Sequence, residues 1–188
     1  MLADQLKTDT LTNHQQLEKM LVGRMKAIRS KEDYISLLQL FYSYFGGLEE
    51  LIDRYINETE MPDYQHRRKS AALAKDIEDL GGEPGQKVSE NALPAIKNSL
   101  QAYAAMYVIE GSTLGGKIIS KMMAQQLGVT HNKGLSFFNG YGENTENMWE
   151  KFKNALNTKA KTPHEEQIII SAANETFEKF KEWAQKTM

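Results

Sequence analysis

The amino-acid sequence predicts an all-α protein that folds as one multi-helix bundle. Only 4 of its 188 residues are proline, so few positions interrupt a helix. The long stretches between glycine clusters carry apolar residues three and four positions apart, which is the period of a helix rather than of a strand. The sequence contains no internal repeat and no change of composition, and we therefore expect a single domain over residues 1–188.

Composition limits the chemistry available to the chain. The sequence contains no cysteine, which excludes disulfides, iron–sulfur clusters, zinc–cysteine sites and thiol nucleophiles. The formal net charge is -2, with 23 basic and 25 acidic side chains, so we expect no general attraction to nucleic acid. Because the sequence shows neither a secretory signal nor a run of about 18 apolar residues, we expect a cytoplasmic protein without membrane insertion.

The first two predicted helices have distinct signals. The first runs from about Leu2 to Met25, and a single stripe along it consists of Leu2, Leu6, Thr10, Leu17 and Leu21. The second begins after Ser30, a favourable N-cap with Asp33 as a partial capping box, and continues to about Ile56.

The middle of the chain predicts two further helices. One extends from about Asp63 to Leu80 and ends at a glycine pair, which is a typical C-cap. The next begins near Leu93 and Pro94, with proline in the first turn, and runs towards Gly128 through an internal glycine cluster.

The last third of the chain begins with a predicted loop over residues 128–142. Helical spacing resumes between Met148 and Leu156. The last helix has the clearest start, with Thr162 as N-cap, Pro163 at the first position and Glu165 completing a capping box, and it continues to about residue 186. We expect about seven helices in all.

His14 is the first candidate functional residue. It lies between Thr10 and Leu17 on the stripe of the first predicted helix, so we expect its imidazole to point inward. A buried imidazole needs a hydrogen bond or a metal ion to satisfy its nitrogens. Considered alone, a histidine at such a position is more often a hydrogen-bonded core or surface residue than a ligand.

Two charged residues share roughly the same helix face as His14. Glu18 follows one turn later, where its carboxylate can accept the proton of the second ring nitrogen and make the imidazole more basic. Lys7 precedes His14 by seven residues, so a ligand against His14 would be able to present an anionic group to it. The alternative for Lys7 is an ordinary solvated lysine.

Three glycines mark a second candidate region, within YVIEGSTLGGKIISKMM. Gly111, Gly115 and Gly116 each cost a helix about 1 kcal/mol relative to alanine, so we expect a steric need for bare backbone. Tyr107, Gly111 and Gly115 are four residues apart, so one helix face passes from an aromatic ring to exposed backbone. This face would let a flat ligand approach the helix axis; the alternative is a tight crossing of two helices.

Other motifs for metal, phosphate or nucleic acid are absent from the sequence. GSTLGG lacks the lysine of a phosphate-binding loop, and neither HExxH nor a pair of Glu-x-x-His motifs occurs. His66, His131 and His164 occupy a polar helix start, a loop and a first helical turn, where surface histidines are common. The basic run from His66 to Lys69 is too small to predict a nucleic-acid site.

Four segments, in the same order along the chain, resemble the bacterial form of the haem oxygenase family. LKTDTLTNHQQLE, from Leu6 to Glu18, resembles the family's segment around its proximal histidine, and YVIEGSTLGG resembles its distal-helix motif. HRRKSAALAKDI and FFNGYGENTENMWEKF resemble two further segments of the family. The match extends roughly from Leu6 to Phe177, and this breadth makes it more specific than any single motif.

The resemblance implies both a fold and an activity. It implies a haem oxygenase-type bundle with haem between the N-terminal proximal helix and a glycine-kinked distal helix. Haem would be both substrate and cofactor, and dioxygen with electrons from a reductase or ferredoxin would open its ring to biliverdin, carbon monoxide and ferrous iron. We also expect a monomer or a weak dimer.

On the proximal side, the resemblance assigns four residues. His14 would be the axial ligand of the haem iron, with Glu18 as its hydrogen-bond partner. Lys7 and Lys153 would form charge pairs with the carboxylates of haem.

On the distal side, the resemblance places Gly111, Ser112, Gly115 and Gly116 in the catalytic wall, with Tyr107 also at the haem. Bare backbone there would leave room for dioxygen but supply no second protein ligand. The animal form has an aspartate where this chain has Ser112, and bacterial relatives also lack it. Proton delivery would then depend on another hydroxyl or on a water chain.

Two alternatives to a haem oxygenase remain open at this point. In one, the same fold serves an enzyme of cofactor metabolism that binds another small ring system, and His14 ligates no iron. In the other, the protein is a haem carrier or sensor that binds haem through His14 without opening the ring, a hypothesis that Ser112 favours.

Overall fold

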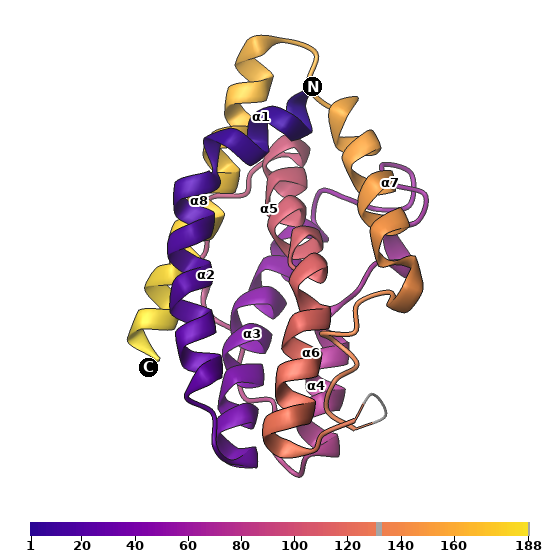
Figure 1. The fold of residues 1–188 in the computed structure, drawn as a ribbon. Helices are drawn as coiled ribbons and strands as arrows, with labels where there is room; N and C mark the ends of the chain where they lie inside the picture. The colour runs from indigo at the N-terminus through magenta and orange to yellow at the C-terminus, as the bar shows by residue number, and fades with distance from the viewer. Residues whose placement is uncertain (131–132, 188) are drawn as a thin grey trace.

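The computed structural model describes residues 1–130 and 133–187, and Figure 1 shows that they fold as a bundle of α-helices. The α-helices are α1 (Leu2–Asp9), α2 (Leu11–Lys26), α3 (Lys31–Ile52), α4 (Ser70–Asp79), α5 (Ser99–Gly111), α6 (Thr113–Leu127), α7 (Thr145–Asn157) and α8 (Pro163–Lys186). Only isolated bridges, and no β-strand, occur within the described ranges, so the all-α prediction is confirmed. His131 lies outside the described residues.

The first predicted helix is two helices in the structure. Thr10 separates α1 from α2 with φ -104° and ψ 1°, and its hydroxyl donates to the carbonyl of Leu6 at 2.7 Å. The stripe nevertheless stays buried across this break, because Leu2, Thr10 and Leu21 are 5%, 2% and 8% exposed. The prediction of one continuous helix was wrong, but the apolar face that it used is the buried one.

The capping signals locate two helix starts correctly. The hydroxyl of Ser30 accepts a hydrogen bond from the backbone of Asp33, whose carboxylate accepts one from the backbone of Ser30 in return. The hydroxyl of Thr162 accepts from the backbone of Glu165, and Pro163 is the first residue of α8. Side-chain caps are local interactions, which is why the sequence identifies them.

Three other predicted boundaries were wrong. Helix α3 ends at Ile52 rather than near Ile56, and α4 begins at Ser70 because residues 63–69 form a short 3-10 turn followed by extended backbone. Helix α5 begins at Ser99, where the side chain of Asn98 caps it, so Pro94 does not lie in its first turn. These segments follow tertiary contacts instead of helix propensity.

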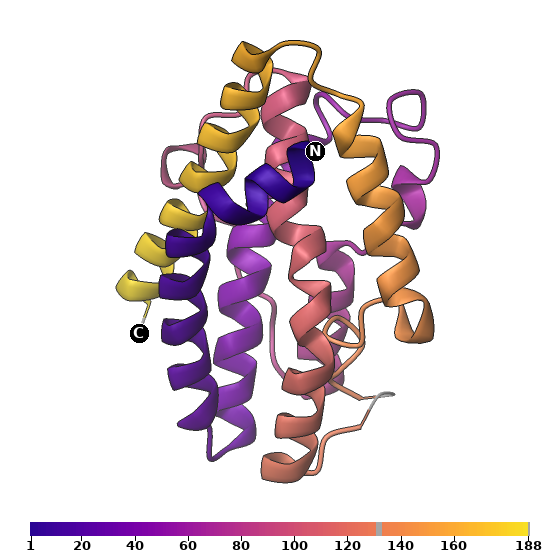
Figure 2. The same cartoon turned by 45° about the horizontal axis from the view of Figure 1, so that its top comes forward.

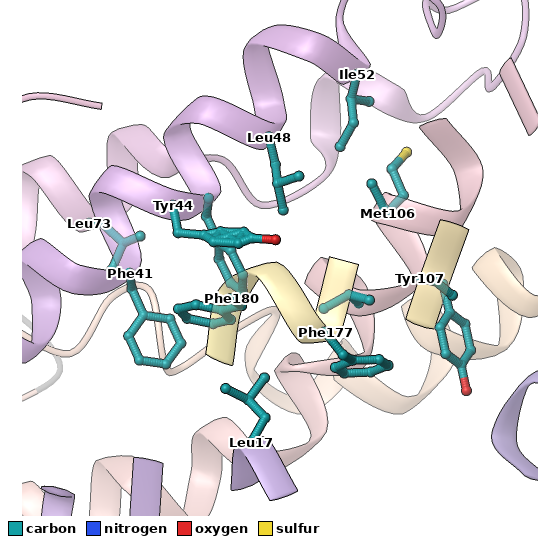
Figure 3. Close-up of a cluster of buried hydrophobic side chains, with 14 of the residues drawn as sticks. Leu17, Phe41, Tyr44, Leu48, Ile52, Leu73, Met106, Tyr107, Phe177 and Phe180 are labelled. Atoms are coloured by element: carbon teal, nitrogen blue, oxygen red, sulfur yellow. The ribbon is translucent and has the colours of Figure 1, made fainter. Parts of the chain in front are cut away.

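Helix α5 runs through the middle of the bundle, with α2 and α8 on one side and α7 on the other, in both Figure 1 and Figure 2. It packs most extensively on α8, and also on α3, α6 and α7. Figure 3 shows part of the core, in which Phe41, Tyr44 and Phe180 make edge-to-face and tilted ring contacts. No helix in the described ranges is long and apolar enough to cross a membrane.

Candidate functional site

His14 lies on α2 with its side chain exposed, at the boundary between the core and the surface. Its ring meets the buried ring of Phe177 on α8 edge-on, with 5.6 Å between centroids and 66° between planes. The prediction of an inward-pointing imidazole was therefore wrong, because the side chain is exposed and only one side of the ring contacts the core. The imidazole is held from one side by an aromatic ring, and its other side is open to a ligand.

The charged residues expected near His14 are also exposed. Glu18 lies one turn along α2, and within the described chain neither a hydrogen bond nor an ion pair joins it to His14. Lys7 lies in the last turn of α1 and forms no ion pair with any described residue. Among the described residues, the carboxylate of Glu18 and the ammonium group of Lys7 are therefore exposed and without an ion pair.

The glycine cluster lies at the junction of α5 and α6, which Ser112 interrupts for a single residue. A β-carbon on Gly111 would be 3.5 Å from the ring of Trp149, an ordinary contact, and one on Gly115 would meet no atom within 4 Å. Packing inside the protein therefore requires glycine at neither position. Bare backbone at these two residues leaves space on the outer face of the junction.

Gly116 differs from its two neighbours in the cluster. A β-carbon at this position would lie 1.9 Å from the carbonyl oxygen of Phe138, so any larger residue would collide with backbone. Gly116 faces that loop and is buried, whereas Gly115 is exposed. Its assignment to the same face as Gly111 and Gly115 was therefore wrong, and its steric need is a close contact between a helix and a loop.

Tyr107 lies between the junction and Phe177, the residue of α8 that contacts His14. It lies one turn before Gly111 on α5, is 9% exposed, and stands beside Phe177 in the cluster of Figure 3. Burial raises the pKa of Tyr107, and a hydrogen bond with the hydroxyl of Thr10 partly offsets this. The imidazole and the phenol thus both lie beside α8, and the phenol is one turn from the first glycine of the junction.

Large apolar side chains are left exposed on both helices that face this region. Leu114 and Ile118 are 46% and 69% exposed and share a face of α6 with Gly115. Leu11 is 44% exposed and lies one turn before His14 on α2. A flat, largely apolar ligand such as haem would cover these side chains, so the residues present fit a bound porphyrin.

Lys153 contacts Trp149, which lies beside Gly111 at the same junction. Its ammonium group is 5.7 Å from the centre of the Trp149 ring and forms an ion pair with Glu150 at 2.6 Å. Trp149 in turn is the side chain nearest to the β-carbon position of Gly111. Helix α1, which carries Lys7, packs on α7, which carries Lys153.

A buried ionic network supports the junction from behind, and sequence reasoning missed it. Arg67 pairs with Glu110 at 3.1 Å and with Asp63 at 2.8 Å, and the side chains of Arg67 and Glu110 are each 2% exposed. The hydroxyl of Tyr141 donates to Glu110 at 2.8 Å. Burial opposes the charge of Arg67, but the carboxylates of Glu110 and Asp63 together raise its pKa. A carboxylate in the apolar run before GSTLGG was the available signal, since it requires a buried partner.

Arg68 binds the junction directly. Its guanidinium donates to the carbonyl of Ile109 at 2.8 Å, to the hydroxyl of Ser112 at 2.5 Å and to the carbonyl of Phe137 at 3.1 Å. Burial lowers its pKa to about 10. The hydroxyl of Ser112 also donates to Ile109 at 2.6 Å, so both of its bonds lie within this network. The two arginines belong to the run HRRK, which the sequence analysis considered only as a nucleic-acid site and judged too small for one.

One small cavity lies behind the α5–α6 junction, and a larger groove lies beside α7. A cavity of about 20 Å³ adjoins Arg67, Arg68 and Glu110, and a groove of about 390 Å³ adjoins Lys151 and Lys159. Neither is lined by His14 or by the glycines of the junction. The candidate site is therefore a pair of exposed helix faces that a ligand would complete.

Comparison with known proteins places the chain in one family. The family model described as heme oxygenase matches residues 1–186. The heme oxygenase of Xanthomonas campestris pv. campestris (strain 8004) is 27% identical over 150 residues, which cover 79% of this chain and 87% of that protein.

Solved structures agree with this match. The NO- and CO-bound heme oxygenase of Neisseria meningitidis superposes with a TM-score of 0.86 and 25% identity, covering 100% of this chain and 92% of the other. The heme oxygenase of Leptospira interrogans shares the fold, with a TM-score of 0.75, 20% identity and 98% coverage of both chains. Together with the geometry of His14 and the glycine junction, these matches show that the chain belongs to the haem oxygenase family.

Proposed function

We propose that the protein binds haem between α2 and the α5–α6 junction and opens its ring to biliverdin, with release of carbon monoxide and ferrous iron. The observation that carries the proposal is the pairing of two helix faces. One presents an exposed imidazole held by Phe177, and the other presents bare backbone at Gly111 and Gly115. When bound, haem supplies the iron that activates dioxygen and the ring carbon that is oxidised.

His14 would hold the haem iron in this proposal. The edge-on ring of Phe177 packs against the imidazole from one side and would restrict its rotation. Glu18, one turn away, accepts the proton of the other nitrogen, directly or through water, once the imidazole is ligating. A neutral imidazole is a weaker electron donor than a thiolate, so haem held by His14 would be suited to oxidation of its own ring.

The α5–α6 junction forms the opposite wall. Gly111 and Gly115 offer no side chain that could bind the iron, so bare backbone here would leave room for dioxygen. The hydroxyl of Ser112 is directed to Ile109 and Arg68, and it donates no proton to the site directly. Proton supply therefore passes through water held near the junction.

Lys7 and Lys153 hold the carboxylates of the ligand. Both are cations on the helices α1 and α7, which pack against each other beside the candidate site. We further propose dioxygen and an external reductase or ferredoxin as the co-substrates, a cytoplasmic location, and a monomer or weak dimer.

The test is a titration of the purified protein and of His14→Ala with haemin, followed by ascorbate or a reductase as electron source. We expect a defined Soret band and conversion to a biliverdin spectrum for the parent protein, and neither for His14→Ala. His164→Ala is the matched control, since His164 is an exposed histidine in the first turn of α8.

Two other outcomes would replace the proposal. Absence of a defined Soret band in the parent protein would favour an enzyme acting on another small ring system. A Soret band that depends on His14 but does not progress beyond reduction would favour a haem carrier or sensor. The engagement of Ser112 within the protein is the observation that favours this last candidate.

A further inference from the structure

The segment from Gly134 to Phe138, which we name the brace, is fastened to two core helices. The hydroxyl of Tyr34 on α3 donates to the carbonyl of Gly134 at 2.6 Å. The carboxylate of Asp76 on α4 accepts from the backbone of Ser136 at 3.0 Å, from its hydroxyl at 2.5 Å, and from the backbone of Phe137 at 2.9 Å. These bonds fix the brace relative to α3 and α4.

Asp76 is fully buried, at 0% exposure, and no cation pairs with it among the described residues. A buried carboxylate is costly unless hydrogen bonds satisfy it, and here both oxygens are occupied by donors from the brace. Burial and the negative charge of Asp76 raise the pKa of Tyr34. Among the described residues, the carboxylate of Asp76 therefore accepts hydrogen bonds only from the brace.

The other side of the brace supports α6. The carbonyl oxygen of Phe138 occupies the place of a β-carbon on Gly116, so helix and brace are in backbone contact there. The ring of Phe137 lies 3.7 Å from the guanidinium carbon of Arg68, which also binds Ser112 at the start of α6. The position of α6 is thus set from behind, by a segment that does not touch the candidate ligand face.

We propose that Asp76 is a positioning residue that holds α6, and with it the exposed face of Gly115, at a fixed distance from the rest of the bundle. The carboxylate fixes Ser136 and Phe137, the brace then fixes Gly116, and Gly116 is adjacent in the chain to Gly115. The consequence for haem rests on the proposed function, but the mechanical link does not.

The first experiment measures amide hydrogen exchange in Asp76→Asn without added haem. The asparagine keeps the size of the side chain but replaces one acceptor oxygen with an NH₂ group, which would face backbone N–H donors. We expect exchange in α6 and the brace to be about tenfold faster, while exchange in α2 and α8 is unchanged. Asp79→Asn is the matched control, because Asp79 is on the same helix but pairs only with the exposed Lys75.

Two results of this experiment would overturn the proposal. One is exchange in α6 that matches the parent protein and Asp79→Asn. The other is equal acceleration in every helix, because Asp76 would then stabilise the whole fold without a particular hold on α6. If Asp76→Asn does not fold, Ser136→Ala removes one of the three donors, and the same two results in that variant would overturn the proposal.

A second measurement addresses the consequence for haem. We expect Asp76→Asn to keep a Soret band that depends on His14, while the C–O stretch of its carbon monoxide complex becomes broader than that of the parent protein. An unchanged C–O stretch together with faster exchange in α6 would overturn the link to the ligand and leave the brace itself intact. Failure of both the parent protein and the variant to bind haemin would contradict the proposed function instead, since the exchange result does not depend on haem.

Discussion

The carbonyl oxygen of Phe138 lies 1.9 Å from the position that a β-carbon on Gly116 would take, whereas a β-carbon on Gly115 would meet nothing within 4 Å. Adjacent glycines in one helix therefore serve different purposes. Gly116 allows the brace to contact α6, and Gly115 leaves the outer face of α6 open.

The two glycines should respond in opposite ways to alanine. We expect Gly116→Ala to destabilise the protein by about 1–3 kcal/mol, because the new methyl group collides with backbone. Gly115→Ala should stabilise the haem-free protein by up to about 1 kcal/mol, because alanine is the better helix former, and should weaken haemin binding. Unfolding in urea measures the stability of both variants, and a haemin titration measures the binding of Gly115→Ala. Equal stability of the two variants would contradict this prediction.

The buried pair of Arg67 and Glu110 should matter more than exposed pairs. Replacing Glu110 with glutamine leaves the guanidinium of Arg67 with only Asp63 as a carboxylate partner. We expect a loss of about 3–5 kcal/mol in the free energy of unfolding. Glu150→Gln, which breaks the partly exposed pair with Lys153, is the control, with an expected loss of at most about 1 kcal/mol. Comparable losses in the two variants would contradict the prediction that the buried ion pair of Arg67 and Glu110 stabilises the protein more than an exposed pair does.

Stability should fall on the alkaline side. Burial raises the pKa of Tyr34, Tyr64 and Tyr141 above the usual value of 10.0, so the folded protein keeps phenol protons that the unfolded chain loses. Their contribution is complete below that pH and is lost as the pH rises above it. The lowered pKa values of Arg24, Arg68 and Lys69 act in the opposite direction, but we expect the larger shifts of the phenols to outweigh them.

The measurement is the urea midpoint between about pH 9 and pH 11, followed together with phenolate absorbance. We expect the midpoint to fall, and these phenols to titrate only as the protein unfolds. A midpoint that rises over this range would show that the buried cations Arg24, Arg68 and Lys69 dominate.

The two lysines near the site should influence haem affinity through charge. We expect Lys7→Ala and Lys153→Ala each to weaken haemin binding by up to about fivefold, because exposed ion pairs contribute about 1 kcal/mol or less. The effect should shrink at high salt, where screening weakens surface charges. Lys31→Ala, an exposed lysine at the start of α3, should bind haemin like the parent protein at every salt concentration.

Local signals in the sequence identified much of the fold. Ser30 and Thr162 start their helices as predicted because a cap depends on residues only three positions away. The break at Thr10 lies beside a hydrogen bond from Asn174 to the carbonyl of Asp9, and the backbone of Ser70 donates to Glu49. No local pattern encodes such long-range bonds. Helix existence and the buried stripe were therefore predictable, whereas several boundaries were not.

The candidate site was predictable only in part. Residue spacing identified His14 and the glycines as candidates, but it could not distinguish Gly116 from Gly115. Only Gly116 contacts the carbonyl of Phe138, which lies in a loop more than twenty positions further along the chain. The buried roles of the arginines at 67 and 68 were not predicted, since a basic run carries no mark of burial. Glu110 was the clue that sequence reasoning overlooked.

The bonds of Arg68 join residues 41, 44 and 69 positions away in the chain. Contacts over such separations form late during folding, after nearby helices have already associated, because closing a long loop costs entropy. The bulk of the helices should therefore assemble before the junction acquires its final shape. A weakened variant would then lose recognition of its substrate at a lower urea concentration than its far-UV circular dichroism.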